Sequence, residues 1–127
     1  LRAWGVARIF GYPGDGINGV IGALRRAGAG RPGAPLEFVQ VAHEELAGLM
    51  AAAHAKFAGD GTGADRTGAE VGVCLSTGGP GAIHLLNGLY DAKLDHQPVV
   101  AIVGQQAQHA LGGSAQQETD LRAILQD

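Results

Sequence analysis

Short apolar runs alternate along the chain with longer segments that have helical periodicity. The apolar runs predict four strands, at residues 6–10, 36–41, 71–77 and 98–104. The last two runs contain little polar alternation, which is typical of strands covered on both faces of a parallel sheet. The segments between the strands predict three helices, at residues 17–27, 43–58 and 82–93. This order predicts an α/β fold, with an open, mainly parallel sheet flanked by helices.

The predicted second helix carries one apolar stripe at helical spacing, formed by Leu46, Leu49, Met50, Ala53 and Phe57. Such a stripe is typical of a helix that packs on a hydrophobic core. At the chain ends, residues 1–5 resemble the end of a helix and residues 117–126 contain a possible further helix. We therefore expect residues 1–127 to be a single domain that is truncated at both ends.

The turn after the first strand contains a glycine-rich motif. Residues 14–19 match G-x-G-x-x-G, the fingerprint of a dinucleotide-binding turn. In that turn the first glycine follows the strand directly, whereas Tyr12 and Pro13 intervene here, and Asp15 would bring a negative charge near a diphosphate. Three interpretations stay open: a tight turn that needs glycine at positive φ, the wall of another cofactor site, or a dinucleotide site.

Two acidic residues, Glu44 and Glu45, follow the second strand at the start of a helix. Ligands of open α/β sheets bind beyond the carboxyl ends of the strands, so either carboxylate is a candidate functional group. Both could instead complement the helix dipole. Residues 43–47 are not a zinc motif of the form H-E-x-x-H, because Ala47 stands where the second histidine would be.

The turn after the third strand is also rich in glycine. Gly78, Gly79 and Gly81 permit close approach of the backbone, and Pro80 suits a turn or the first position of a helix. His84 follows within that helix and could face solvent, core or a site. The remaining histidines have no metal-ligand spacing, and we expect no metal site in the chain.

Composition narrows the possible functions. Nine Lys and Arg against twelve Asp and Glu give a formal net charge of −3, and the basic residues form no block, so nucleic-acid binding is not indicated. The single cysteine, Cys74, lies in an apolar run and predicts a buried, inert thiol. No apolar stretch reaches the ~18 residues of a membrane span, and no signal peptide is visible, so we expect a cytoplasmic protein.

Taken together, the turns resemble the amino-terminal, pyrimidine-binding domain of thiamine-diphosphate-dependent enzymes of the pyruvate oxidase and acetolactate synthase family. Four segments carry the resemblance, in the family's order and over nearly the whole chain: "GYPGDGINGVIGAL", "HEELAGLMAAAHAKFAG", "STGGPGAIHLLNGLYDAKLDHQPVVAIVGQ" and "QQET". The run around His84 is more similar to the pyruvate oxidase branch. Acetolactate synthases more often carry Asn at that position.

The resemblance implies roles for particular residues. Glu44 corresponds to the catalytic glutamate, which hydrogen-bonds a ring nitrogen of the cofactor's aminopyrimidine and so promotes removal of the thiazolium proton. The implied cofactor-binding residues are Tyr12, Pro13, Gly14, Glu44, Thr77, Gly78, Pro80 and Gly81. On the substrate side the resemblance implies His84, Gln116 and Gln117, although oxidases commonly carry an aromatic pair where Ala115 and Gln116 stand.

The family's other domains are not within these residues. The resemblance implies a domain that binds diphosphate and magnesium, and a central domain that in some members binds FAD. It also implies a homo-oligomer, a dimer or tetramer, with the active site between subunits and a 2-keto acid as substrate.

Residues 59–61 and Asn87 have the spacing of the family's GDG…N magnesium signature. They would lie in a loop and a helix, so we interpret residues 59–70 as a surface loop. The alternative function is a stand-alone nucleotide-binding or regulatory α/β module.

Overall fold

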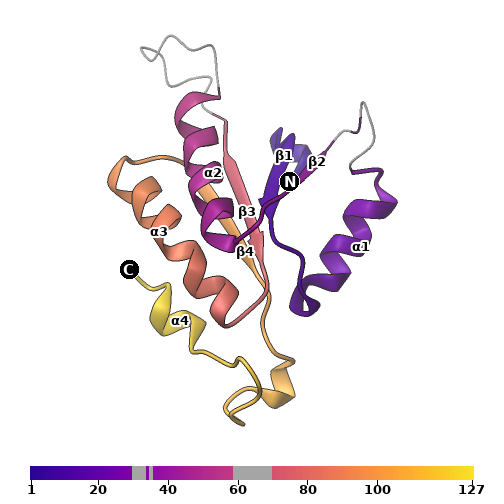
Figure 1. Cartoon of the computed structure of the whole chain (residues 1–127), viewed down its shortest axis with the longest axis vertical. Coiled ribbons are helices and arrows are strands. Elements are labelled where there is room, and N and C mark those ends of the chain that lie inside the picture. The colour runs from indigo at the N-terminus through magenta and orange to yellow at the C-terminus, as the bar shows by residue number, and fades with distance from the viewer. Residues whose placement is uncertain (30–33, 35, 59–69) are drawn as a thin grey trace.

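The sheet consists of four parallel strands in a computed structural model that describes residues 1–29, 34, 36–58 and 70–127 (Figure 1). The strand order is β2-β1-β3-β4, and every described pairing is parallel. The strands are β1 (Arg8–Gly11), β2 (Glu37–Gln40), β3 (Gly72–Ser76) and β4 (Val99–Val103). Each overlaps a predicted apolar run, and the predicted parallel α/β fold is confirmed.

Helices cover both faces of this sheet. The α-helices are α1 (Asn18–Arg26), α2 (Glu44–Phe57), α3 (Pro80–Leu94) and α4 (Leu121–Ile124). Helix α1 lies on one face of the sheet, and α2 and α3 lie side by side on the other (Figure 1). Helix α3 begins two residues before the predicted start, because Pro80 occupies its first turn, where the missing N–H costs no hydrogen bond.

The chain ends are less helical than the pattern predicts. Residues 1–5 contain only a short 3₁₀ helix, η1 (Arg2–Trp4), which ends at Gly5 with a φ of 77°. Within residues 117–126 only α4 is helical. Its start is capped by Asp120, whose carboxylate accepts a hydrogen bond from the N–H of Ala123.

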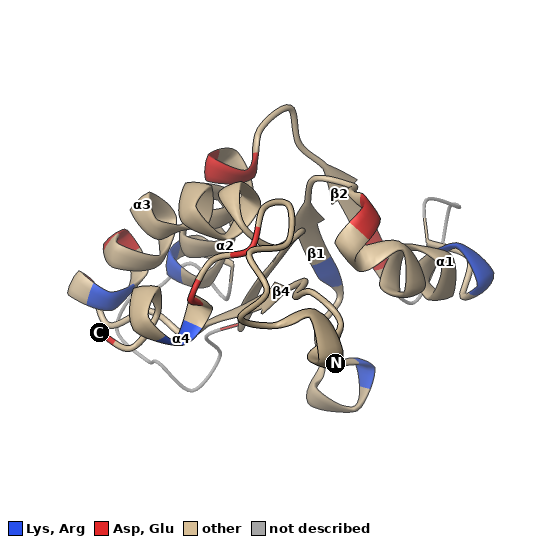
Figure 2. Cartoon of the chain, turned by 90° about the horizontal axis from the view of Figure 1, so that it is seen from below, with Lys and Arg blue, Asp and Glu red and all other residues tan. Residues whose placement is uncertain are grey.

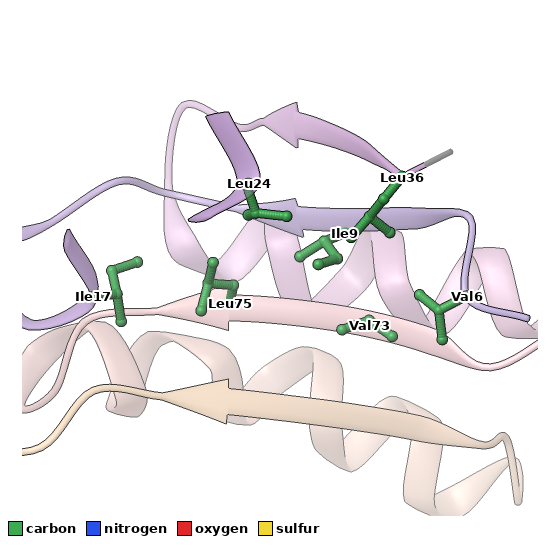
Figure 3. Packing of buried hydrophobic residues seen from close by; sticks show 7 residues of the cluster. All are labelled: Val6, Ile9, Ile17, Leu24, Leu36, Val73 and Leu75. Atoms are coloured by element: carbon green, nitrogen blue, oxygen red, sulfur yellow. The ribbon is translucent and has the colours of Figure 1, made fainter. Parts of the chain in front are cut away.

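Side chains alternate between two hydrophobic clusters on opposite faces of the sheet. One cluster, shown in Figure 3, lies under α1 and contains Val6, Ile9, Ile17, Leu24, Leu36, Val73 and Leu75. The other lies under α2 and α3 and contains Phe10, Val41, Ala47, Ala51, Cys74 and Leu85. Cys74 is buried as predicted, and burial raises the pKa of its thiol to about 12.

Strand β3 is buried along its whole length, as predicted, but β4 is only half-buried. The difference follows from strand order, because β3 lies between two strands and β4 at the edge of the described sheet. The prediction that both strands are covered on both faces was therefore wrong for β4 within this chain.

Helices α2 and α3 touch through their backbones. An ideal Cβ on Gly48 would lie 2.9 Å from the carbonyl oxygen of Leu85, and one on Gly88 would overlap the backbone of Gly48 and Leu49. The buried face of α2 accordingly consists of small residues, Ala47, Gly48, Ala51, Ala52 and Ala55. At the far end of α2 the ammonium of Lys56 lies 2.7 Å from a carboxylate oxygen of both Asp91 and Asp95, which raises the pKa of Lys56.

The predicted apolar stripe of α2 is not its packing face. Leu46, Leu49 and Met50 are partly exposed, and Phe57 is 79% exposed. The large side chains are excluded from the buried face because the close approach of α2 to α3 leaves room only for glycine and alanine. The stripe points outward instead, together with exposed apolar residues Ile83, Tyr90 and Leu94 of α3. No described helix is long and apolar enough to cross a membrane.

Replacing Gly88 by alanine tests the helix contact. The added methyl has no space, so G88A should lower the free energy of unfolding by roughly 1–3 kcal/mol or more. Gly19→Ala is the matched control, since a Cβ there meets nothing within 4 Å and α1 would gain up to about 1 kcal/mol of helix propensity. Chemical denaturation of both variants measures the difference. Equal effects would contradict a backbone contact between α2 and α3.

Candidate functional site

A cavity of about 660 Å³ opens at the carboxyl edge of the sheet, where the turns after β1 and β3 meet the start of α2. Figure 2 views the molecule from this side. Eight residues implied by the resemblance line it: Tyr12, Pro13, Gly14, Glu44, Thr77, Gly78, Gln116 and Gln117. Three others, Pro80, Gly81 and His84, do not line the cavity. The structure thus brings most of the implied residues together and leaves Pro80 exposed at the start of α3.

The glycine-rich turn after β1 does not have the form of a dinucleotide turn. Tyr12 and Pro13 separate it from the strand, and a 3₁₀ helix, η2 (Asp15–Ile17), precedes α1. The positive-φ glycines of the described chain lie elsewhere, so the interpretation that this turn needs glycine for positive φ was wrong. Glycine is needed here for space, because a Cβ on Gly16 would lie 2.6 Å from the hydroxyl of Thr77.

Glu44 occupies the first position of α2 and reaches the wall of the cavity. Its side chain is 13% exposed, and its Oε2 lies 3.1 Å from Nδ1 of His84. His43 caps the helix, since its Nδ1 accepts a hydrogen bond from the N–H of Glu45 at 3.2 Å. The rings of His43 and His84 lie 4.4 Å apart between centroids. Sequence reasoning missed both the role of His43 and the contact between Glu44 and His84.

The second acidic residue, Glu45, faces away from the cavity. Its Oε1 accepts a hydrogen bond from Nδ2 of Asn87 at 2.6 Å, which ties the start of α2 to the middle of α3. Asn87 lies within α3, as the sequence predicts, and its bond to Glu45 of α2 was not predicted. The rest of the imitated magnesium signature, with residues 59–69 of the predicted surface loop, lies outside the described residues. Glu44 thus faces the cavity and Glu45 faces α3, a difference that helical periodicity in the sequence does not reveal.

The turn after β3 brings the backbone close to both neighbouring walls. Gly79 has a φ of 61°, and a side chain there would overlap the carbonyl oxygen of Gln117. A Cβ on Gly81 would lie 3.5 Å from Oε1 of Glu44 and 3.1 Å from the Thr77 methyl. The contact with Glu44 would be an ordinary one, so the tight fit at Gly81 is against the Thr77 methyl, and Gly81 is not part of the cavity lining.

The segment after β4 forms the second wall of the cavity. Sequence reasoning identified Gln116 and Gln117 there but missed Gln105, Gln106, Leu111, Glu118, Thr119 and Leu121. The wall is held together by Nε2 of Gln106, which donates to the Gln116 carbonyl at 2.7 Å. The Thr119 hydroxyl oxygen is buried and has no hydrogen-bond partner among the described residues. Thr119 itself is among the residues that line the cavity.

The cavity is acidic. Asp15, Glu44 and Glu118 line it, and no Lys or Arg is among its described lining residues. Figure 2 shows basic residues at the end of α1, at the start of β1 and on α4, where Arg122 follows the lining residue Leu121. A neutral or hydrogen-bonding ring suits such a cavity, whereas a diphosphate would find no positive side chain to balance its charge.

The parallel sheet and the polar cavity at its carboxyl edge are those of an α/β domain that binds a small molecule. A family model described as "Thiamine pyrophosphate enzyme, N-terminal TPP binding domain" matches residues 1–124. The chain belongs to this family of thiamine pyrophosphate (thiamine diphosphate) enzyme domains.

Individual relatives agree with the family assignment. The chain is 46% identical to YdaP of Bacillus subtilis (strain 168), described as thiamine pyrophosphate-containing, over 100% of this chain and 20% of the relative. It is 39% identical to the pyruvate oxidase of Lactiplantibacillus plantarum, over 100% of this chain and 19% of that protein. It is 40% identical to the acetolactate synthase isozyme 2 large subunit of Escherichia coli K12, over 98% of this chain and 20% of that subunit. The chain thus spans about a fifth of the length of these relatives.

The second wall should loosen in acid. The carboxylate of Glu118 accepts hydrogen bonds from the N–H groups of Gly112 and Ala115, and these bonds lower the pKa of Glu118 below its ordinary value of 4.5. A depressed pKa in the folded chain means that the stabilisation is present above 4.5 and is lost as the pH falls through the lowered value. NMR titration of the two amides should therefore show a transition below pH 4.5.

Glu118→Gln is the control for this titration, because an amide side chain does not ionise over this range. The amide resonances of Gly112 and Ala115 should then stop responding to pH. A transition of the same size in E118Q would assign the acid response to another carboxyl group.

Proposed function

We propose that this chain holds the aminopyrimidine end of thiamine diphosphate in a larger enzyme that decarboxylates a 2-keto acid. The observation that carries the proposal is the nearly buried Glu44 carboxylate in the wall of the cavity, beside two glycine-rich turns. The substrate is pyruvate-like, and the reaction ends in oxidation or in ligation to a second carbonyl compound. The identities of the relatives, a pyruvate oxidase and an acetolactate synthase, support this class.

The residues present fit one end of the cofactor. The acidic, cation-free lining suits a neutral aminopyrimidine, and Thr119 offers an unsatisfied hydroxyl. Gly14, Gly78 and Thr77 would hold the ring by their backbone and side-chain surfaces, with Tyr12 and Pro13 beside them. When bound, thiamine diphosphate supplies the nucleophilic carbon that attacks the keto carbon of the substrate.

Glu44 would donate and take back the proton that this chemistry needs. Oε2 faces His84, which leaves Oε1 for a hydrogen bond to a ring nitrogen of the cofactor. A proton on Oε1 is donated in that bond and can return to the same oxygen, so the carboxyl group acts as a general acid and base. His84 holds the carboxyl group in orientation by its Nδ1, and Gln116 and Gln117 lie on the substrate side of the cavity.

The remaining parts of the site would come from elsewhere in the protein. The diphosphate and its magnesium ion need ligands that the described cavity lacks, so we assign them to a further domain, and FAD, where present, to a central domain. The outward apolar residues of α2 and α3 support burial of this face in a homo-oligomer, a dimer or tetramer with the site between subunits. A cytoplasmic location remains a prediction.

Glu44→Gln tests the catalytic assignment in the complete protein. The amide keeps the size of the side chain but cannot exchange a proton, so turnover with a 2-keto acid should fall by roughly 10²–10⁴-fold. Glu45→Gln is the matched control, since Glu45 begins the same helix but bonds Asn87 outside the cavity. Equal, small losses in both variants would favour a role in the helix dipole alone.

Ligand binding by residues 1–127 alone separates the proposal from the stand-alone nucleotide-binding module. Without a cation for the diphosphate, calorimetry should give millimolar or weaker dissociation constants for both thiamine diphosphate and NAD, about −4 kcal/mol. The complete protein should bind thiamine diphosphate far more tightly, and only with magnesium. Micromolar binding of NAD by residues 1–127 would overturn the proposal for this cavity.

A further inference from the structure

Two imidazoles and a carboxylate meet at the start of α2. His43, Glu44 and His84 each offer one ligand atom, and the three atoms lie within 4.8 Å of one another. The spacing along the chain gives no sign of this cluster, because His84 comes from α3 and approaches only through the packing of the two helices. No other group of three such residues was found in the described parts of the chain.

The donor set selects the metal. Two histidines and one carboxylate are the protein ligands of many zinc sites that keep a fourth position for water, whereas magnesium and calcium prefer oxygen ligands alone. Ligand atoms about 2.0–2.1 Å from one tetrahedral zinc ion are roughly 3.4 Å apart. Glu44 Oε2 and His84 Nδ1 are already 3.1 Å apart, so rotation of the exposed His43 side chain is the main adjustment.

Two effects oppose a cation at this position. The N-terminus of α2 carries the positive end of the helix dipole, and Glu44 offsets it. Metal binding through either nitrogen of His43 also gives up the capping bond to Glu45 N–H, because the free lone pair then lies on the metal-bound nitrogen. Loss of a cap costs about 1 kcal/mol, so the site should be weaker than a structural zinc site. His84 is 41% exposed, which leaves a path for the ion.

We propose that His43, Glu44 and His84 form a zinc site whose occupation inhibits the enzyme. The bound ion would be coordinated by the Glu44 carboxylate and by the His84 nitrogen that otherwise faces this carboxylate. A zinc ion on Oε2 withdraws electron density from the carboxylate and lowers the basicity of Oε1, so Oε1 could no longer hold the proton described above. The inhibition rests on the proposed function of Glu44, whereas zinc binding itself does not.

Calorimetric titration of the complete, cofactor-free protein with Zn²⁺ tests the site, in excess magnesium to fill oxygen-rich sites. Three variants remove ligands: His43→Asn, which keeps a good helix cap, His84→Asn and Glu44→Gln. Each should abolish the binding event or weaken it at least tenfold. His109→Asn is the control, since His109 is exposed and outside the cluster, and it should bind zinc like the parent protein. Co²⁺ provides a spectroscopic check, because its visible absorption reports nitrogen and carboxylate ligation.

The outcomes are distinguishable from those of the proposed function. Unchanged zinc affinity in His43→Asn and His84→Asn would overturn the site, even where Glu44→Gln abolishes turnover. Zinc binding lost in the three variants, without zinc inhibition of the parent protein, would overturn the inhibitory role. Inhibition at the same zinc concentration that fills the site, and loss of that sensitivity in His43→Asn, would support both parts.

Discussion

The backbone contact between α2 and α3 at Gly48 and Gly88 is the constraint on which the site depends. Both helices begin at the carboxyl edge because each follows a parallel strand, and the contact brings them close enough that Glu44 meets His84 and Glu45 meets Asn87. A larger residue at either glycine would separate the helices and, with them, these pairs. The position of the Glu44 carboxylate therefore depends on the packing between the two helices, which requires glycine at both contact positions.

That constraint also determines the outer surface. Because only glycine and alanine fit between the helices, the large apolar residues of α2 are left facing outward, Phe57 among them. Helix α2 thus has small residues on its buried face and large apolar residues on its exposed face.

The sequence predicted the order of strands and helices because apolar period and turn residues are local properties. The family resemblance also implied Tyr12, Glu44 and Gly78, and all three line the cavity. The sequence could not predict the contacts of side chains that meet only in the packed structure. The direction of the α2 stripe depended on Gly88, forty residues further along the chain than Gly48, and the link from Glu44 to His84 depended on the same contact. Of the three interpretations of the first turn, the one that needs positive φ was wrong, because a glycine required for close approach to Thr77 looks the same in the sequence as one required for positive φ.

The charge of the cavity decides which ligand groups its described walls favour. Three acidic residues and no basic residue line the described walls, so the cavity favours a neutral or partly protonated ring and disfavours phosphate. Under the proposed function the diphosphate is therefore assigned to another part of the protein, and the carboxylate of Glu44 lies in a wall whose described residues include no Lys or Arg. With no Lys or Arg among the described lining residues, the positive end of the α2 dipole is the main charge that opposes a metal ion beside Glu44. A carboxylate kept clear for proton transfer is, for that reason, also available as a ligand.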